Sequence, residues 1–263
     1  MEYQFDFLVL GSGIAGLSYA LKVAQHGSVA VITKKDKKET STNYAQGGIA
    51  TVLDPDDSFQ LHVEDTINSG DGLCHLEVVE RVIRSGPERI RELVEIGVEF
   101  NRGRSTSSPF DLGREGGHSR NRIVHAQDFT GRALEQALIA AAEQNANIQF
   151  FENHFAIDLI IQHRSIRAGA FPVEQEDICR GAYVFNSNSS EIHTFLAHVV
   201  VLCTGGAGKV YLYTSNPDVA TGDGLAMAYR AGAQLANLEF VQFHPTCLYH
   251  PHAKNFLISE AVR

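Results

Sequence analysis

The stretch from Phe5 to Thr33 constrains the fold of this chain more than any other. It opens with the apolar run FDFLVL, which has the length of a strand, and the glycine-rich sequence GSGIAG follows at once. Helical spacing then places four apolar residues on one face: Leu17, Ala20, Leu21 and Ala24. Residues 28–33, SVAVIT, are a second apolar run. Together these runs predict a strand, a helix and a strand, the β–α–β unit from which α/β folds are built.

The glycines of GSGIAG have different expected roles in such a unit. Gly11 permits a tight turn, Gly13 lets the backbone approach a pyrophosphate, and Gly16 lets the helix pack closely on the strand. The helix N-terminus then presents unpaired N–H groups and a partial positive charge to the phosphates. Because strand, helix and strand frame the motif, it favours a dinucleotide site over a plain glycine-rich turn. Gly27 is expected to end the helix with a positive φ.

The residues after the second strand bear on which dinucleotide is bound. In NAD-binding units an acidic residue about twenty positions beyond the glycines holds a ribose hydroxyl. Here the strand runs into Thr33-Lys34-Lys35, and that acid is absent. This disfavours NAD and leaves FAD, or an unusual contact to the ribose, as the alternatives.

Composition and charge exclude several classes of partner. The 263 residues carry 22 Lys and Arg against 31 Asp and Glu, a formal charge of −9, which disfavours nucleic acid and anionic membranes. No apolar run approaches the roughly 20 residues needed to span a bilayer. The four cysteines form no C-x-x-C pair and no signal peptide precedes the first strand, so we expect free thiols in a cytoplasmic protein.

Small and polar residues follow the β–α–β unit at positions 41–48, STNYAQGG. Two adjacent glycines close behind a dinucleotide motif suit backbone lying against a flat ligand. An ordinary surface loop is the alternative. Residues 54–57 are then predicted to form a solvated acidic turn.

Three helices are expected over residues 58–68, 76–84 and 87–95. Ser58 and Ser85 are predicted to cap the first and the third of them, because a serine hydroxyl accepts from the first free N–H groups. Pro87 suits the first turn of the third helix, and Gly97 its C-terminal end.

Residues 101–122 contain few apolar side chains and many Arg, Ser and Gly. Within them, Gly113 to Ser119 gathers three ionisable groups among three glycines, which suits a polar substrate site. A mobile charged loop is the alternative. Thr130 is expected to cap a helix that shows an apolar side made of Ala133, Leu134, Ala137, Leu138 and Ala141.

From residue 147 the apolar period changes to that of strands. Strands are predicted at 148–151, 155–161, 165–170, 181–185 and 192–196. We expect them to form an antiparallel meander inserted after the nucleotide-binding unit. Residues 199–203, VVVLC, are apolar throughout, as in a buried parallel strand, and Thr204-Gly205-Gly206 follows at the edge where ligands bind.

Two polar residues near the end of the chain have open interpretations. Asp223, within Gly222-Asp223-Gly224, either caps the following helix or binds cofactor hydroxyls. His244 lies in the sequence QFHPT and taken alone is a buried structural histidine.

Taken together, these motifs resemble the succinate dehydrogenase/fumarate reductase flavoprotein family. The matching motifs occur in family order: Gly11–Gly16, Ala45–Gly48, Thr204–Gly206, Gly222–Gly224 and Gln242–Thr246. The resemblance implies an α/β fold with a Rossmann-like, two-dinucleotide-binding-domain flavoprotein architecture, an inserted antiparallel β-meander and the start of an α+β capping domain. It places the FAD-binding domain at residues 1–236 and the start of the capping domain at 237–263.

Two places narrow the resemblance. Membrane-bound members attach FAD covalently through a histidine, and the corresponding place here falls at about Ser41, so FAD is expected to be non-covalent. Residues 114–119, REGGHS, resemble the signature of the L-aspartate oxidase branch, as do 41–48 and 249–251. In that branch the glutamate of the signature, here Glu115, faces the substrate amino group.

The resemblance to that branch implies the chemistry and its residues. L-aspartate is oxidised to iminoaspartate, which quinolinate synthase uses in NAD biosynthesis, and O₂ or fumarate accepts the electrons. Glu115 would pair with the substrate ammonium or receive its proton, while His244 and Ser259, with Glu260 beside them, would hold a carboxylate. No metal site is implied. The implied FAD contacts are Gly11, Ser12, Gly13, Ile14, Ala15, Gly16, Lys34, Ser41, Thr42, Asn43, Tyr44, Ala45, Gln46, Gly47, Gly48 and Asp223.

Family members continue for roughly as many residues again. The resemblance therefore places a catalytic arginine and a second substrate histidine outside these 263 residues, and we expect the chain alone to be an incomplete, inactive fragment. Two alternatives remain open: a soluble fumarate reductase or succinate oxidase, against which Glu115 speaks, and a non-catalytic FAD-binding remnant.

Overall fold

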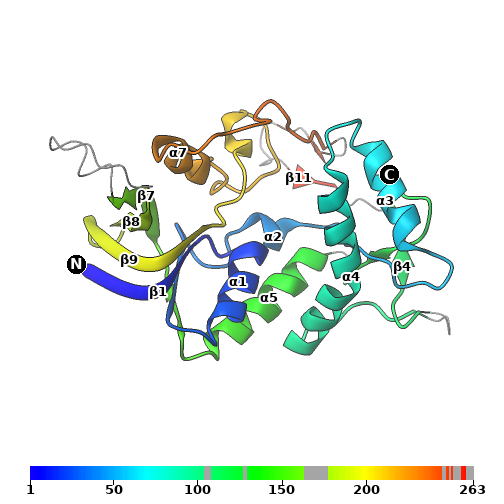
Figure 1. The fold of residues 1–263 in the computed structure, drawn as a ribbon, viewed down its shortest axis with the longest axis horizontal. Helices are drawn as coiled ribbons and strands as arrows, with labels where there is room; N and C mark the ends of the chain where they lie inside the picture. Colours follow the sequence, from blue (N-terminus) through cyan, green and yellow to red (C-terminus); the bar gives the residue numbers. More distant parts are fainter. Residues whose placement is uncertain are drawn as a thin grey trace. The chain divides into compact units, whose positions relative to one another are not determined.

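A six-stranded sheet with the order β6-β2-β1-β9-β8-β7 is the centre of the first of two units in this computed structural model (Figure 1). The structure describes residues 1–103, 108–126, 129–162, 177–244, 247–248, 250 and 256–258. The first unit consists of Met1–Asn43 and Leu138–Arg263, and the second of Tyr44–Ala137. The strands of the sheet are β1 (Glu2–Leu10), β2 (Val29–Ile32), β6 (Ile148–Phe151), β7 (His154–Ile161), β8 (Cys179–Asn186) and β9 (Glu191–Leu202).

The predicted β–α–β unit is confirmed: β1 and β2 pair in parallel, with α1 (Ile14–Val23) between them. The role expected for Gly27 is wrong. The helix ends at Ala24 in right-handed geometry, and Gly27 has no positive φ. Gly27 is needed because a Cβ there would lie 2.4 Å from a carboxylate oxygen of Asp6. The backbone and hydroxyl of Ser28 donate to the same carboxylate, which lowers the pKa of Asp6.

The inserted antiparallel strands are present, but two assignments within them were wrong. β6 pairs in parallel with β2 and so extends the parallel half of the sheet, because the long connection through residues 33–147 supplies the crossover that parallel pairing requires. The strands predicted at 192–196 and 199–203 are one continuous strand, β9. It pairs antiparallel with β8 over Glu191–Leu196 and in parallel with β1 over Thr194–Leu202. β7 and β8 complete the meander, and the strand predicted at 165–170 lies outside the described residues.

The sheet buries aliphatic and aromatic side chains on the face that carries Leu8, Ala30, Val184 and Phe195. The second half of β9 differs from the prediction of full burial. Val199 and Leu202 are 41% and 38% exposed. An apolar sequence permits a strand to be buried but does not require it. Among the described residues, nothing covers these two side chains completely.

The remaining elements of the first unit lie after β9. They are the 3₁₀ turn η1 (Gly208–Val210), the helix α7 (Asp223–Arg230) and the short antiparallel pair β10 (Cys247–Leu248) and β11 (Phe256–Leu257). α7 packs against β7 (Figure 1). Among the helices described, none is long and apolar enough to cross a bilayer. The domain boundary expected at residue 236 stays a prediction.

The second unit contains a small antiparallel sheet and helices. Its strands have the order β3-β5-β4, and α3 packs against α4. The bounds are β3 (Ile49–Ala50), α3 (Phe59–Ser69), α4 (Leu76–Ile96), β4 (Leu112–Gly113) and β5 (Ile123–Val124). α2 (Ser41–Tyr44) and α5 (Thr130–Glu143) each contain residues of both units.

The helix caps of the second unit met the predictions in part. Ser58 caps α3, with its hydroxyl accepting from the Leu61 N–H at 3.2 Å, and Gly97 ends α4 with a φ of 109°. The two helices predicted at 76–84 and 87–95 are one, α4, with Pro87 inside it. Ser85 does not cap, because its hydroxyl donates to the Arg81 carbonyl one turn earlier. Thr130 is the first helical residue of α5 and accepts from the Ala126 N–H.

Candidate functional site

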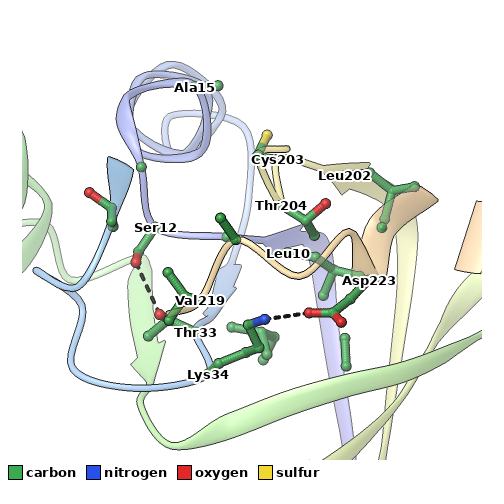
Figure 2. Close-up of a pocket in the computed structure, with 18 of the residues that line it drawn as sticks. Leu10, Ser12, Ala15, Thr33, Lys34, Leu202, Cys203, Thr204, Val219 and Asp223 are labelled. Atoms are coloured by element: carbon green, nitrogen blue, oxygen red, sulfur yellow. Dashed lines mark hydrogen bonds and ion pairs between the residues drawn. The ribbon is translucent and has the colours of Figure 1, made fainter. Parts of the chain in front are cut away.

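A cavity of about 500 Å³ lies in the first unit where strands β1, β2 and β9 end (Figure 2). Leu10, Ile32 and Leu202, the last residues of these strands, all line it. The carboxyl ends of parallel strands are where open α/β sheets bind ligands, and the volume is typical of cofactor pockets. Of the residues expected to contact the cofactor, Gly11, Ser12, Gly13, Ile14, Ala15, Lys34, Ser41, Thr42 and Asp223 line this cavity.

The glycines of the first turn are required by close contacts. Gly11 has a φ of +117°, and a Cβ there would lie 2.2 Å from the Cys203 carbonyl oxygen. A Cβ on Gly16 would lie 2.0 Å from the Gly11 carbonyl oxygen, so Gly16 serves the packing of helix on strand and does not itself line the cavity. At Gly13 a Cβ would lie 3.3 Å from the Thr42 hydroxyl, a tight contact, and Gly13 itself lines the cavity.

The N-terminus of α1 faces the cavity through Gly13, Ile14 and Ala15. Gly13 is the N-cap residue and has no side chain that could occupy the free N–H groups of the first turn. The Thr42 hydroxyl accepts from the Ile14 N–H at 3.1 Å and ties the 41–42 segment to this turn. A helix start of this kind carries partial positive charge and binds anions such as a pyrophosphate.

A second wall of the cavity is polar and comes from the end of β2 and the start of α7. Lys34 forms an ion pair with Asp223 (Figure 2). Lys34 also donates to the Thr221 hydroxyl at 2.6 Å. Asp223 is not an N-cap. Gly222 occupies that position in left-handed geometry with a φ of 77°, and Asp223 is the first helical residue. Its carboxylate is therefore directed at Lys34 and at the cavity, where carboxylate oxygens can accept from hydroxyl groups.

Several lining residues were missed by the sequence analysis. Ser12 donates to the Thr33 hydroxyl at 3.1 Å, so Thr33 helps to fix the glycine turn (Figure 2). His154 and Phe155 also line the cavity. They follow β6, and the rule that ligands bind at the carboxyl ends of parallel strands would have found them. Assigning β6 to the antiparallel meander concealed that signal.

The residues present fit a dinucleotide with a flat ring system. The helix start and Lys34 offer positive charge for a pyrophosphate, and Asp223 offers an acceptor for hydroxyl groups. Apolar lining residues such as Leu10, Ile32 and Met227 suit planar rings. Cys203 lines the same cavity, and burial raises the pKa of its thiol, so it is neutral near pH 7.

The rest of the 41–48 segment does not line this cavity. Asn43 lies in the first unit, where its N–H donates to the Thr40 hydroxyl. Tyr44, Ala45, Gln46, Gly47 and Gly48 belong to the second unit. A Cβ on Gly48 would lie 2.4 Å from the Val124 carbonyl oxygen, so this glycine is required by packing on β5. Their contact with a cofactor stays a prediction.

Glu115 lies in the second unit, on the loop that joins β4 to β5. The His118 N–H donates to the Glu115 carbonyl at 3.3 Å and closes a turn in which Gly117 has a φ of +83°. The Glu115 side chain is exposed, and within the described ranges no residue forms a hydrogen bond or ion pair with its carboxylate. The loop therefore forms a hydrogen-bonded turn, and the Glu115 carboxylate remains available.

A buried ion cluster made of Asp57, Asp65 and Arg122 lies beside this loop in the same unit. Arg122 is fully buried, and the Asp57 side chain is 1% exposed. The prediction that residues 54–57 form a solvated turn is therefore wrong for Asp57, whose carboxylate is covered because it pairs with a buried guanidinium. Nothing in the local sequence marks this pair, since the partners are 65 residues apart.

The residues expected to bind substrate carboxylates are only partly described. His244 is half-buried and lines a separate cavity of about 190 Å³ in the first unit, together with Gln242, Phe243 and Tyr211. Ser259 and Glu260 lie outside the described residues, as do most of residues 249–251. In the described part of the chain, no group of three or more His, Cys, Asp or Glu side chains is placed to hold a metal ion.

Similarity to known proteins agrees with this geometry. L-aspartate oxidase of Acinetobacter baylyi is 48% identical over 99% of this chain, which spans 47% of that protein. L-aspartate oxidase 2-b, chloroplastic, of Nicotiana tabacum is 50% identical over 98% of this chain, which spans 40% of it. Among solved structures, E. coli quinol fumarate reductase matches with a TM-score of 0.87 and 32% identity, covering 98% of this chain and 42% of that one.

The chain thus spans less than half the length of these relatives. The family described as FAD binding domain matches residues 6–263, which is nearly the whole sequence. The match includes the glycine turn, the ends of β1, β2 and β9 and the Lys34–Asp223 pair that surround the cavity. The chain belongs to the FAD binding domain family, and its cofactor is FAD.

Proposed function

We propose that these residues form the FAD-binding part of an enzyme that oxidises L-aspartate to iminoaspartate. The observation that carries the proposal is the 48–50% identity to L-aspartate oxidases over 98–99% of this chain. The match to quinol fumarate reductase is much weaker, at 32% identity. Because the chain spans less than half of these relatives, the activity proposed is that of the whole protein that carries these residues.

The first unit would hold the cofactor without a covalent bond. Gly11 to Ala15 and the start of α1 would bind the pyrophosphate, Lys34 and Asp223 the polar groups beside it, and Ser41 stands where covalent members have a histidine. When bound, FAD supplies a two-electron oxidant for the carbon that bears the substrate amine. Acid precipitation of the purified protein should release all FAD to the supernatant, and yellow colour left on the polypeptide would contradict non-covalent binding.

Glu115 would recognise the amino group of the substrate. A carboxylate near the substrate ammonium can pair with it or accept its proton, and loss of that proton favours oxidation of the neighbouring carbon. The exposed Glu115 carboxylate, which no described residue engages, lies on a hydrogen-bonded turn and supports this role. His244, with Ser259 and Glu260, would hold one carboxylate of the substrate.

The rest of the reaction follows from these assignments. Electrons would pass to O₂ or to fumarate, and iminoaspartate would be consumed by quinolinate synthase in the de novo synthesis of NAD. We place the protein in the cytoplasm, a reducing compartment that suits its free cysteines. Both the acceptor and the link to quinolinate synthase are parts of the proposal.

A second candidate function is a soluble fumarate reductase or succinate oxidase. The structural match to E. coli quinol fumarate reductase, and the TM-score of 0.85 and 30% identity to Mycobacterium smegmatis Sdh1, favour it. Succinate and fumarate have no amino group, so this candidate gives Glu115 no substrate group to bind. A third candidate is an FAD-binding remnant without catalytic activity.

An anaerobic titration separates the three candidates. A full-length protein that carries these residues is purified with FAD, and its visible absorbance is followed as L-aspartate is added, with succinate added to a parallel sample. Bleaching by aspartate and not by succinate is the expected result. Bleaching by succinate alone would establish the second candidate, and no bleaching by either the third.

A further inference from the structure

The buried ion cluster of Asp57, Asp65 and Arg122 contacts the loop that carries Glu115. We propose that Asp65 and Arg122 are positioning residues for Glu115: they fix the 114–121 loop so that its carboxylate meets the substrate amine. This inference rests on the proposed function, in which Glu115 reads that amine. It assigns a role to a side chain on helix α3, far from Glu115 in sequence, and to one just before β5.

Arg122 is held from two sides within the cluster. Its Nε and Nη2 donate to the two oxygens of Asp57 at 2.9 and 2.8 Å, a bidentate pair. Its Nη1 donates to Asp65 Oδ2 at 2.7 Å. The side chain is 0% exposed, so the planar guanidinium has one arrangement in which all three of these groups are paired.

The cluster contacts the loop on the C-terminal side of its turn. Asp65 Oδ2 accepts from both the N–H and the hydroxyl of Ser119, each at 2.8 Å. Arg122 Nη1 lies 3.4 Å from His118 Nδ1. On the other side, the Arg122 N–H donates to the Gly113 carbonyl at 3.0 Å and closes the base of the loop. Both flanks of the turn are therefore fixed.

The glycines of the loop fit this arrangement. Gly117 has a φ of +83°, and a Cβ there would lie 3.0 Å from the Ser69 hydroxyl, so the turn lies directly against the end of α3. A Cβ added at Gly116 would meet no atom within 4 Å among the described residues. The turn is thus packed against α3 at Gly117 and open at Gly116, and Asp65 on α3, together with Arg122, determines where it lies.

The cluster is expected to fix the conformation of the loop more than it lowers the free energy of folding. Removing the Asp57 carboxylate and the Arg122 guanidinium from water is costly, and well-packed apolar side chains often stabilise a fold as well or better. What a buried ion network can add is a single, well-defined conformation. Burial tends to raise the pKa of Asp65, but the hydrogen bonds from Ser119 and Arg122 outweigh it and leave that pKa below its ordinary value. The carboxylate therefore stays ionised and keeps its hold on the loop near neutral pH.

The test uses three single variants of the full-length protein. Asp65→Asn removes the charge that Ser119 and Arg122 bind, and Ser119→Ala removes one hydrogen bond while leaving the Arg122 pairs intact. Glu64→Gln is the matched control, because Glu64 is the exposed neighbour of Asp65 on α3 and its only hydrogen bond among the described residues is accepted from Gln60 within the helix. We expect Asp65→Asn to lower kcat/KM for aspartate by roughly ten- to a hundredfold, as a displaced catalytic group does. Ser119→Ala should cause a smaller loss, and Glu64→Gln none.

A double-mutant cycle separates positioning from general damage. If Asp65 acts through Glu115, the Asp65→Asn change should cost little further activity once Glu115 is already Gln. Fumarate reduction and FAD content should be nearly unchanged in Asp65→Asn. Additive losses in the cycle, or equal losses with aspartate and fumarate, would overturn the inference.

Hydrogen exchange gives a readout that does not depend on activity. In the 263-residue chain, amides of residues 115–121 should exchange faster in Asp65→Asn and in Ser119→Ala, and at the normal rate in Glu64→Gln. Unchanged exchange in all three variants would overturn the inference even if activity falls. If the unmodified full-length protein fails to oxidise aspartate, the proposed function fails instead, and the cycle with Glu115 fails with it.

Discussion

The cavity at the ends of β1, β2 and β9 and the loop that carries Glu115 are built in opposite ways. The cavity is shaped by bare backbone: Gly11 and Gly16 are required because a single carbon would collide with a carbonyl oxygen. The loop is held by buried charge, through Arg122 and its two carboxylates. Backbone packing suits a cofactor that is the same in many enzymes, and a charged scaffold suits the selection of one substrate. We infer that the cavity binds the cofactor and that the loop recognises the substrate.

The largest expected effect is a loss of FAD binding that leaves the Glu115 loop unchanged. Gly13→Val should abolish retention of FAD, because a branched side chain would fill the space between the turn and Thr42 that the pyrophosphate needs. Gly116→Ala is the matched control, since its added methyl meets nothing within 4 Å in the described part of the chain. FAD bound after gel filtration is measured for both proteins. Normal retention by the valine variant would contradict the assignment of the cavity.

The next largest effect is a loss of aspartate oxidation that leaves FAD binding unchanged. Glu115→Gln removes a negative charge at nearly constant size, so in a full-length protein aspartate oxidation should fall by roughly ten- to a thousandfold, about 1.4–4 kcal/mol. Fumarate reduction should suffer much less and FAD content not at all. Equal losses in the two reactions would show that Glu115 supports the loop and does not read the amine.

A smaller effect tests the ion pair that lines the cavity. Lys34→Met removes a positive charge from the cavity and leaves Asp223 without its ionic partner, so FAD affinity should fall by about tenfold. Lys35→Met, the exposed neighbour, serves as the control. Titration of each protein with FAD, followed by flavin fluorescence, gives the dissociation constants. Equal affinities in the two variants would limit Lys34 to a structural role.

The smallest effect concerns pH and the charged side. Burial, and then the nearby Arg122 and His118, lower the pKa of His62 below 6.5 in the folded chain. The unfolded chain therefore takes up a proton first, and stability should decline as pH falls below 6.5 towards the folded pKa. Urea unfolding at pH 7.5 and 5.5 measures this, with His62→Gln as the variant that should flatten the difference. An unchanged pH dependence in that variant would exclude His62 as its source.

The same contrast explains what could be predicted from the sequence. The glycine turn was predictable because a fixed spacing within six residues carries the whole geometric requirement. The role expected for Gly27 was wrong because its constraint comes from Asp6 on β1, which is far from it in sequence. Two helices are predicted where the structure has α4 alone, because Ser85 and Pro87 are typical of a helix start. The apolar face, which is continuous through both residues, indicates one helix.

The charged cluster could not have been predicted in this way. Asp57 and Asp65 are 65 and 57 residues from Arg122, and each taken alone has the sequence context of a solvated side chain. Only the packing of α3 beside the β4–β5 loop brings them together. The parallel pairing of β6 was likewise set by a long connection, which is why His154 and Phe155 were not among the expected lining residues.

Hydrogen exchange of the 263-residue chain with and without FAD tests most directly whether FAD binds in the cavity and not at the Glu115 loop. It reports on both regions in one experiment. We expect FAD to slow exchange at residues 11–15, which line the cavity, and within 219–228, where most residues line it, and we expect Gly13→Val to remove this protection. Exchange at 57–65, beneath the loop, should change much less. Unchanged exchange at 11–15, with protection confined to residues 113–122, would show that the charged region holds the cofactor and would contradict the assignment of the cavity to FAD.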